Sequence, residues 1–138
     1  MANVRKIDGR YEIWDVMRRK WVAYTPEEGV RQWLAEYLVS RGVEHWRMAA
    51  EYMQVVDGRR LRLDILVYNK RSQPVMICEC KAPEIPVNDG VFMQAANYNR
   101  LLRVPYLLVT NGNVLYCARV DVASGSYEFL DTIPDLGE

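Results

Sequence analysis

The chain has 138 residues, and its 18 lysines and arginines are balanced by 18 aspartates and glutamates, so its formal net charge is zero. Hydrophobic residues make up 50% of the chain and charged residues 26%, which is typical of a globular domain and not of a disordered tail. These values exclude a highly basic DNA-coating protein, and the length excludes a tandem of motor, reader and nuclease domains.

We expect one domain over residues 1–138, with an N-terminal hairpin over 11–24, a core over 25–120 and a C-terminal extension over 121–138. No apolar run reaches the length of a membrane helix, and the polar N-terminus lacks the apolar segment of a secretory signal. The sequence therefore predicts a cytoplasmic protein with no membrane partner.

The three cysteines, Cys78, Cys80 and Cys117, lack the spacing of a zinc knuckle or a redox motif. We expect them to be small buried side chains in a reducing compartment. The one histidine, His45, cannot by itself form a histidine metal cage. Acid–base chemistry must therefore rest mostly on carboxylates, lysine and tyrosine.

The first elements along the chain are a hairpin and a helix. Segments 11–16 and 21–24 are rich in aromatic and β-branched residues, which predicts two strands joined by a basic turn. Thr25 can then cap a helix, with Glu28 three residues later as the partner in a capping box. Apolar residues recur at helical spacing up to Leu38, and Gly42 is placed to end the helix.

Three consecutive strands follow, over residues 49–56, 61–68 and 75–81. Asp57-Gly58 predicts a tight turn between the first two, and a second reversal occupies 69–74. Residues 89–103 have helical periodicity.

The last predicted strands cover 106–110 and 114–120 around Asn111-Gly112, and a further short strand is expected at 127–130. The order helix, three strands, helix, strands defines an α/β fold. We expect an αβββαβ core in which helices flank a mixed central sheet, preceded by the N-terminal β-hairpin.

Alternation along the strands brings charged residues together. Asp64 lies opposite the face expected to carry Leu61, Leu63, Ile65 and Val67, while Glu79 and Lys81 share one face of the next strand. If these two strands pair, Asp64 and Glu79 converge and Lys81 lies one pleat further along. An aspartate inside a Leu-Ile-Val strand is unfavourable unless it has a use, and this makes Asp64 the strongest single candidate.

Two carboxylates and an ammonium group on a sheet suit Mg²⁺-assisted phosphodiester hydrolysis. Mg²⁺ takes oxygen ligands, which Asp64, Glu79 and the backbone carbonyl of Cys80 would supply, and Mn²⁺ is the expected substitute. The ion would activate the attacking water. Lys81 would orient or deprotonate that water, or stabilise charge on the phosphorus, and the sequence leaves these roles open.

These residues resemble the D…ExK signature of the PD-(D/E)xK nuclease superfamily, with Asp64 fifteen residues before Glu79-Cys80-Lys81 and Leu63 in place of the usual proline. Gln94 and Tyr98 match the QxxxY motif of one branch, which includes the N-terminal nuclease domain of type I restriction enzyme R (motor) subunits. Segments 25–32, 79–83 and 108–112 are also similar to small stand-alone proteins of that family. The similarity covers roughly residues 11–120.

The resemblance implies a restriction-endonuclease-like core and a Mg²⁺-dependent DNA endonuclease of the restriction-modification type. It implies that Asp64 and Glu79 bind the metal, that Lys81 is catalytic, and that Gln94 and Tyr98 support the site or contact DNA. The alternative is a catalytically silent nuclease fold that serves as a DNA-binding or assembly module. No Walker motif follows, so the chain has no ATP site of its own.

Family members often carry another acid on the first helix. Glu27 and Glu28 are the candidates there. Glu28 has a structural explanation as the capping-box partner of Thr25, so we favour Glu27 as a further metal ligand. Glu51 on the first strand of the core is another candidate, although a solvated strand residue is the alternative at that position, and the sequence leaves open which of the three glutamates is the extra acid.

Basic residues around the proposed site would form a positive rim for the phosphate backbone: Arg59, Arg60, Arg62, Lys70, Arg71, Arg100 and Arg103. DNA is the expected partner. The sequence leaves open whether the chain forms a homodimer or recruits motor or methylase subunits in trans.

Overall fold

A computed structural model describes residues 3–136, apart from the side chains of Gln54, Val56, Leu61 and Leu101. A small antiparallel sheet comes first, with strands β1 (Val4–Ile7), β2 (Arg10–Asp15) and β3 (Lys20–Ala23) in that order. The predicted hairpin corresponds to β2 and β3. Strand β1 was not predicted, because its four residues are all exposed and show no apolar alternation.

Helix α1 (Pro26–Ser40) begins as the sequence predicts, because the Thr25 hydroxyl accepts a hydrogen bond from the Glu28 backbone N–H at 3.0 Å. Its C-terminal end is followed by Gly42, which takes a φ of +99°. The capping-box role expected for the Glu28 side chain is wrong, since this carboxylate accepts hydrogen bonds from Arg31 and Gln32 in its own helix. The Glu28 backbone N–H therefore takes part in the cap, while its side chain belongs to a buried polar network.

A short 3₁₀ turn, η1 (His45–Arg47), leads into the main sheet. The sheet contains β4 (Met48–Val56), β5 (Arg59–Tyr68), β6 (Pro74–Cys80), β7 (Tyr106–Thr110), β8 (Leu115–Val120) and β9 (Tyr127–Leu130), neighbouring in that order. Strand β6 pairs with β7 in parallel and the other neighbours are antiparallel, which confirms the predicted mixed sheet. Helix α2 (Asp89–Leu102) makes the crossover between β6 and β7.

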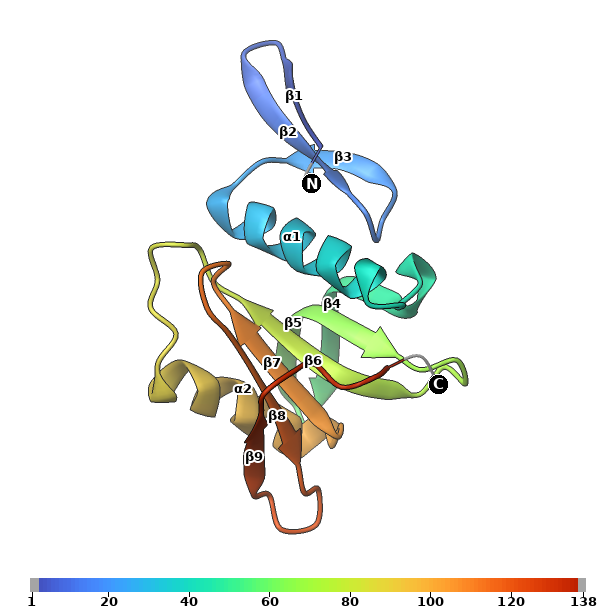
Figure 1. The fold of residues 1–138 in the computed structure, drawn as a ribbon, viewed down its shortest axis with the longest axis vertical. Coiled ribbons are helices and arrows are strands. Elements are labelled where there is room, and N and C mark those ends of the chain that lie inside the picture. Colours follow the sequence, from blue (N-terminus) through green and yellow to red (C-terminus); the bar gives the residue numbers. More distant parts are fainter. Residues whose placement is uncertain (1–2, 137–138) are drawn as a thin grey trace.

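The helices cover opposite faces of this sheet, with α1 on one side and α2 on the other (Figure 1). One apolar cluster joins α1 to alternate residues of β6, namely Met76, Cys78 and Cys80. The second joins α2 to Ile77 on the other face of the same strand. The cysteines are buried and free, as predicted, and burial raises the pKa of the Cys78 thiol well above its usual value.

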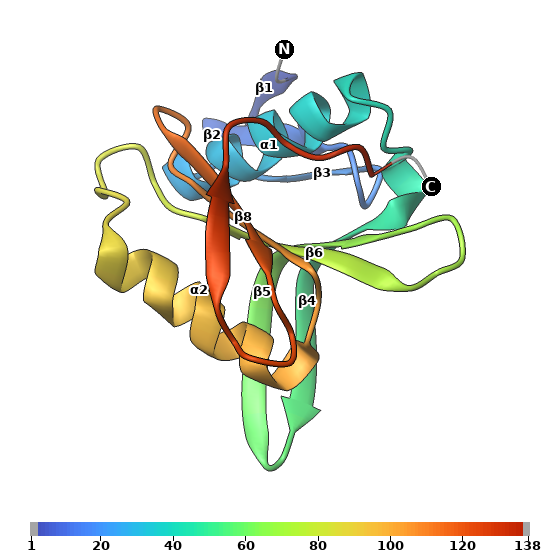
Figure 2. The same ribbon diagram turned by 60° about the horizontal axis from the view of Figure 1, so that its bottom comes forward.

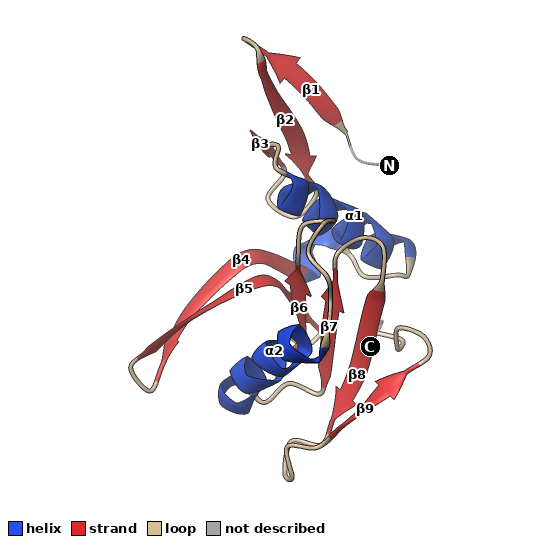
Figure 3. Cartoon of the chain, turned by 90° about the vertical axis from the view of Figure 1, so that its left-hand side faces the viewer, coloured by secondary structure: helices blue, strands red, loops and turns tan. Residues whose placement is uncertain are grey.

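Strands β4 and β5 continue past the edge of the other strands as a bent, projecting ribbon (Figures 2 and 3). The bend lies where Glu51 faces Asp64, since regular pairs flank this position at Ala50–Ile65 and at Tyr52–Leu63. Glu51 takes a φ of +49°, in the left-handed region that non-glycine residues rarely adopt.

The bend also corrects the expected facing of one residue. Ile65 and Val67 face α1 together, as predicted, but Leu63 packs into the cluster beneath α2. Simple alternation fails here because the ribbon twists at Asp64. The expected facing of Leu61 lies outside the described side chains. Within residues 3–136, no helix is long and apolar enough to cross a membrane.

Candidate active site

Asp64 lies at the centre of the candidate site, with both carboxylate oxygens hydrogen-bonded. Its Oδ2 accepts a 2.7 Å bond from the backbone N–H of Cys80, and its Oδ1 accepts a 2.9 Å bond from Arg31 Nη2. The pairing of Ile65 with Cys78 sets the register of β5 against β6 and places Asp64 beside Glu79. The structure therefore brings the aspartate and the Glu79-Cys80-Lys81 segment together on adjacent strands, as the sequence predicts.

Glu79 and Lys81 flank Cys80 at the end of β6, where the Lys81 backbone N–H donates to the Thr110 carbonyl at 2.9 Å. Burial, followed by the charge of Asp64, raises the pKa of Glu79 to about 8, and the Lys81 ammonium partly opposes this rise. The carboxylates thus repel one another in a poorly solvated place. A group with a pKa near neutrality at such a position is a functional-site candidate.

Glu27 approaches the same group from the first turn of α1. Its side chain is 48% exposed, and its Oε1 lies 3.3 Å from Arg31 Nη2. Burial and the negative charge of Asp64 raise the pKa of Glu27, while Arg31 and Lys81 lower it. Glu27 therefore lies within electrostatic reach of the central aspartate, as the position favoured in sequence requires. Its role as a metal ligand stays a prediction.

Arg31 is the site residue that sequence reasoning missed. The side chain is 3% exposed and its guanidinium contacts four carboxylates, which belong to Glu27, Glu28, Glu51 and Asp64, at N···O distances between 2.7 and 3.3 Å. Within the described residues, its Nε is a buried polar atom without a hydrogen-bond partner. The spacing of Arg31 three and four residues after two glutamates was an available signal, although such pairs also occur on solvated helix surfaces.

Glu51 is held in this network and is not the solvated strand residue that the sequence also allowed. It accepts hydrogen bonds from Arg31, from Arg62 and from Arg18 in the turn between β2 and β3. Burial would raise the pKa of Glu51, but the charges of Arg31 and Arg18 lower it below its ordinary value. Arg18 also pairs with the buried Asp15, so the N-terminal sheet is tied to the candidate site.

Gln94 and Tyr98 lie on α2, one turn apart. Gln94 is exposed, and Tyr98 is half-buried against the apolar cluster beneath that helix. In the described part of the chain, neither side chain hydrogen-bonds to Asp64, Glu79 or Lys81. The structure therefore does not join them directly to the carboxylates, and their expected role in DNA contact or site support stays a prediction.

The expected positive rim is divided by the fold. Arg62 contacts the site through Glu51, and Arg59 and Arg60 follow on the same ribbon. Lys70 and Arg71 lie in the turn between β5 and β6, at the other end of β6 from Glu79. These two residues are therefore not part of a rim around the carboxylates.

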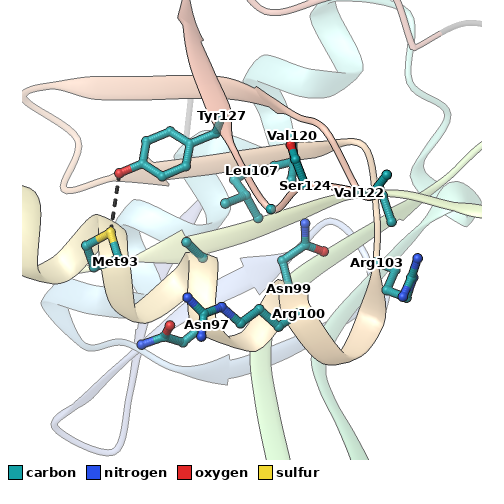
Figure 4. Close-up of a pocket in the computed structure, with 13 residues that line it drawn as sticks. Met93, Asn97, Asn99, Arg100, Arg103, Leu107, Val120, Val122, Ser124 and Tyr127 are labelled. Carbon is teal, nitrogen blue, oxygen red and sulfur yellow. Dashed lines mark hydrogen bonds between the residues drawn. The ribbon is translucent and has the colours of Figure 1, made fainter.

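Arg100 and Arg103 line a separate pocket of about 330 Å³ between the C-terminal half of α2 and the β8–β9 connection. Figure 4 shows their guanidinium groups turned in different directions, while Tyr127 donates a hydrogen bond to the sulfur of Met93 across the opening. None of the carboxylates described above lines this pocket. Because its basic groups do not converge, we do not place the chemistry there.

The donor set at the site suits a hard divalent cation, because Glu27, Asp64 and Glu79 offer carboxylate oxygens and their mutual repulsion would be relieved by positive charge. Among the described residues, no three acidic, cysteine or histidine side chains are already spaced as a formed metal centre. Arg31 and Lys81 supply the positive charge beside these carboxylates.

Comparison with known proteins places this geometry in a family. Residues 26–134 match the family model described as type I restriction enzyme R protein N terminus. A solved fragment of a putative HsdR subunit of a type I restriction enzyme from Vibrio vulnificus YJ016 has a similar fold, with a TM-score of 0.58 and 22% sequence identity. The similarity covers 82% of this chain but 24% of that one, so the chain spans about a quarter of its length. No curated protein matches. The chain belongs to the family of type I restriction enzyme R protein N-terminal domains.

Proposed function

We propose that the chain is a Mg²⁺-dependent DNA endonuclease domain that hydrolyses phosphodiester bonds. The observation that carries this proposal is the placement of Asp64, which is hydrogen-bonded to the backbone of Cys80 between Glu79 and Lys81. Membership of the restriction enzyme R family supports a nuclease-related role. The pKa of Glu79 is raised to about 8, and carboxylates with pKa values shifted this far are typical of functional sites.

Asp64, Glu79 and the Cys80 carbonyl would hold the ion, with Glu27 as a further oxygen ligand. When bound, Mg²⁺ would polarise the phosphoryl oxygen and lower the pKa of the attacking water. Lys81 would stabilise the charge that develops on the phosphate, or orient the water. Arg31 would keep the Asp64 carboxylate in place, since it fixes one oxygen while the Cys80 N–H fixes the other.

Plasmid cleavage in Mg²⁺ or Mn²⁺ tests this assignment. Asp64→Asn and Lys81→Met should each lower cleavage at least about 100-fold, because the first removes a charge that would hold the metal ion and the second removes a charge that would stabilise the phosphate. Asp131→Asn and Lys70→Met are matched controls, since both residues are exposed and lie away from the carboxylates. Folded wild-type protein that neither cuts DNA nor binds either cation would overturn the enzyme assignment.

A second candidate function is a silent nuclease fold that binds DNA or organises an assembly. One observation favours it: Arg31 already supplies a cation to Asp64, with the guanidinium on Oδ1. Such a module would bind DNA in a salt-sensitive way with no metal-dependent cutting, and Asp64→Asn would leave that binding unchanged.

The comparison also supports proposals about partners. The matching structure is a fragment of a putative subunit of a type I restriction enzyme, and this chain spans a fraction of it. We propose DNA as the substrate, with motor or methylase subunits acting in trans or a second copy of the chain completing a double-strand cut. Light scattering of the purified protein, alone and with DNA, distinguishes the monomer from the dimer.

A further inference from the structure

The β4–β5 arm, defined as residues 52–63, projects beside the candidate site (Figures 2 and 3). Its strands pair Met53 with Arg62 and Val55 with Arg60, so these four side chains share one face of the two-stranded ribbon. Met53 and Val55 keep 54% and 67% of their exposure. On this face each apolar side chain lies beside an arginine of the neighbouring strand, and within the described residues neither Met53 nor Val55 is buried in the core.

The charge of the arm differs from that of the whole chain. It carries Arg59, Arg60 and Arg62 with a single acid, Asp57, although basic and acidic residues balance over the full sequence. Asp57 and Gly58 occupy the tip with φ values of 51° and 76°, which suit a two-residue turn. The acid therefore has a structural place at the end of the ribbon, and the exposed surface behind it is positive.

The positive face of the arm is continuous with the candidate site. Arg62 Nη2 donates a 3.0 Å hydrogen bond to Glu51, and Glu51 is bonded to the same Arg31 guanidinium that holds Asp64. The face thus runs from the exposed ribbon directly to the carboxylates. A polymer lying along it would reach them.

We propose that the Met53–Arg62 face of the arm enters the major groove of a DNA duplex and positions one strand at the carboxylates. This inference rests on the proposed function and names the part of the chain that holds the substrate. The major groove is about 12 Å wide and admits a two-stranded ribbon. Arginine bonds phosphates and guanine edges in a bidentate manner, and apolar side chains contact thymine methyl groups.

Duplex binding in the absence of divalent metal tests the arm separately from cleavage. A short fluorescein-labelled duplex is titrated with protein in EDTA, and anisotropy is followed over a series of salt concentrations. The double variant Arg60→Gln/Arg62→Gln should weaken binding about 10-fold or more and reduce the slope of log K against log salt by about 2, because both residues lie on the proposed face. Lys70→Gln/Arg71→Gln removes the same charge from the exposed β5–β6 turn and should leave the slope nearly unchanged.

A second pair of variants tests the apolar part of the face. Met53→Ser and Val55→Ser keep the charge of the arm, and each should weaken binding to a thymine-containing duplex more than to a single strand of the same sequence. Thermal melting of every variant shows whether the fold is kept.

Several outcomes would overturn the arm assignment. These are equal effects of the arm pair and the turn pair, unchanged binding by the arm variants, or arm variants that change the oligomeric state while DNA affinity stays the same. The last result would assign the face to a protein partner. If the arm pair controls binding but wild-type protein never cuts DNA, the nuclease assignment fails while the arm assignment stands.

Discussion

Replacement of Arg31 by methionine should destabilise the protein strongly, because it leaves buried carboxylates without their cation. The guanidinium lies 2.7 Å from Glu28 Oε1 and 2.9 Å from Asp64 Oδ1, and the side chain is 3% exposed. Removing one partner of such a buried ion pair costs about 3–5 kcal/mol, because the remaining charge stays desolvated. Methionine has a similar length, so a cavity contributes little to this figure.

Arg62→Met is the matched control for this measurement. Its guanidinium forms a comparable contact, 3.0 Å from Glu51 Oε1, but its side chain is 63% exposed. A solvated pair of this kind contributes roughly 0–1 kcal/mol. The two variants remove the same chemical group, which is buried among four carboxylates at Arg31 and is paired with one carboxylate at the surface at Arg62.

Urea unfolding at neutral pH, followed by tryptophan fluorescence and circular dichroism, gives both free energies of unfolding. The m-values must agree with that of the wild type for the comparison to hold. The deficit of Arg31→Met should shrink in acid, because protonation neutralises the stranded carboxylates. A loss below about 1 kcal/mol, or one equal to that of Arg62→Met, would refute the view that Arg31 is the buried counter-ion of the site.

Two further predictions concern pH and helix capping. The folded-state pKa of Glu79 is about 8 against an ordinary value of 4.5, so the native state binds the extra proton between these values and stability falls as pH rises through them. Glu79→Gln should therefore be more stable than wild type above pH 8 and similar to it below 4.5; a constant difference across this range in thermal melting would contradict the assigned pKa. Thr25→Ala should cost about 1 kcal/mol by removing the N-cap of α1, whereas Thr132→Ala, at an exposed position, should cost less; equal losses in urea unfolding would show that the cap contributes nothing measurable.

The helices and the main sheet could be predicted because their signals are local. Thr25 and Gly42 bound α1 in the sequence itself, and Asp57-Gly58 marks a turn whatever the rest of the chain does. Strand β1 gave no such signal, since Val4–Ile7 is exposed throughout and is ordered by pairing with β2. Elements whose stability comes from a neighbour are the ones that local patterns miss.

The site residues on the strands could be predicted from the sequence, whereas Arg31 on α1 could not. Asp64 and Glu79 are set by alternation and hairpin pairing, both of which can be read along the chain. The role of Arg31 depends on how α1 is laid against the bend at Glu51, and a three-dimensional approach of this kind leaves little trace in spacing. The exposed position of Gln94 has the same cause, because the tilt of α2 is set by its packing.

The contact between the N-terminal sheet and Glu51 has a consequence for any shortened form of the protein. The family match begins at residue 26, but Arg18, which bonds both Asp15 and Glu51, lies before it. A chain cut back to the matched region would lose a cation from the network and expose Gln32, whose side-chain oxygen accepts from the Val16 backbone. The region that matches the family model therefore does not contain all the residues that hold the charge network together. A shortened chain would have to begin ahead of β2 to keep them.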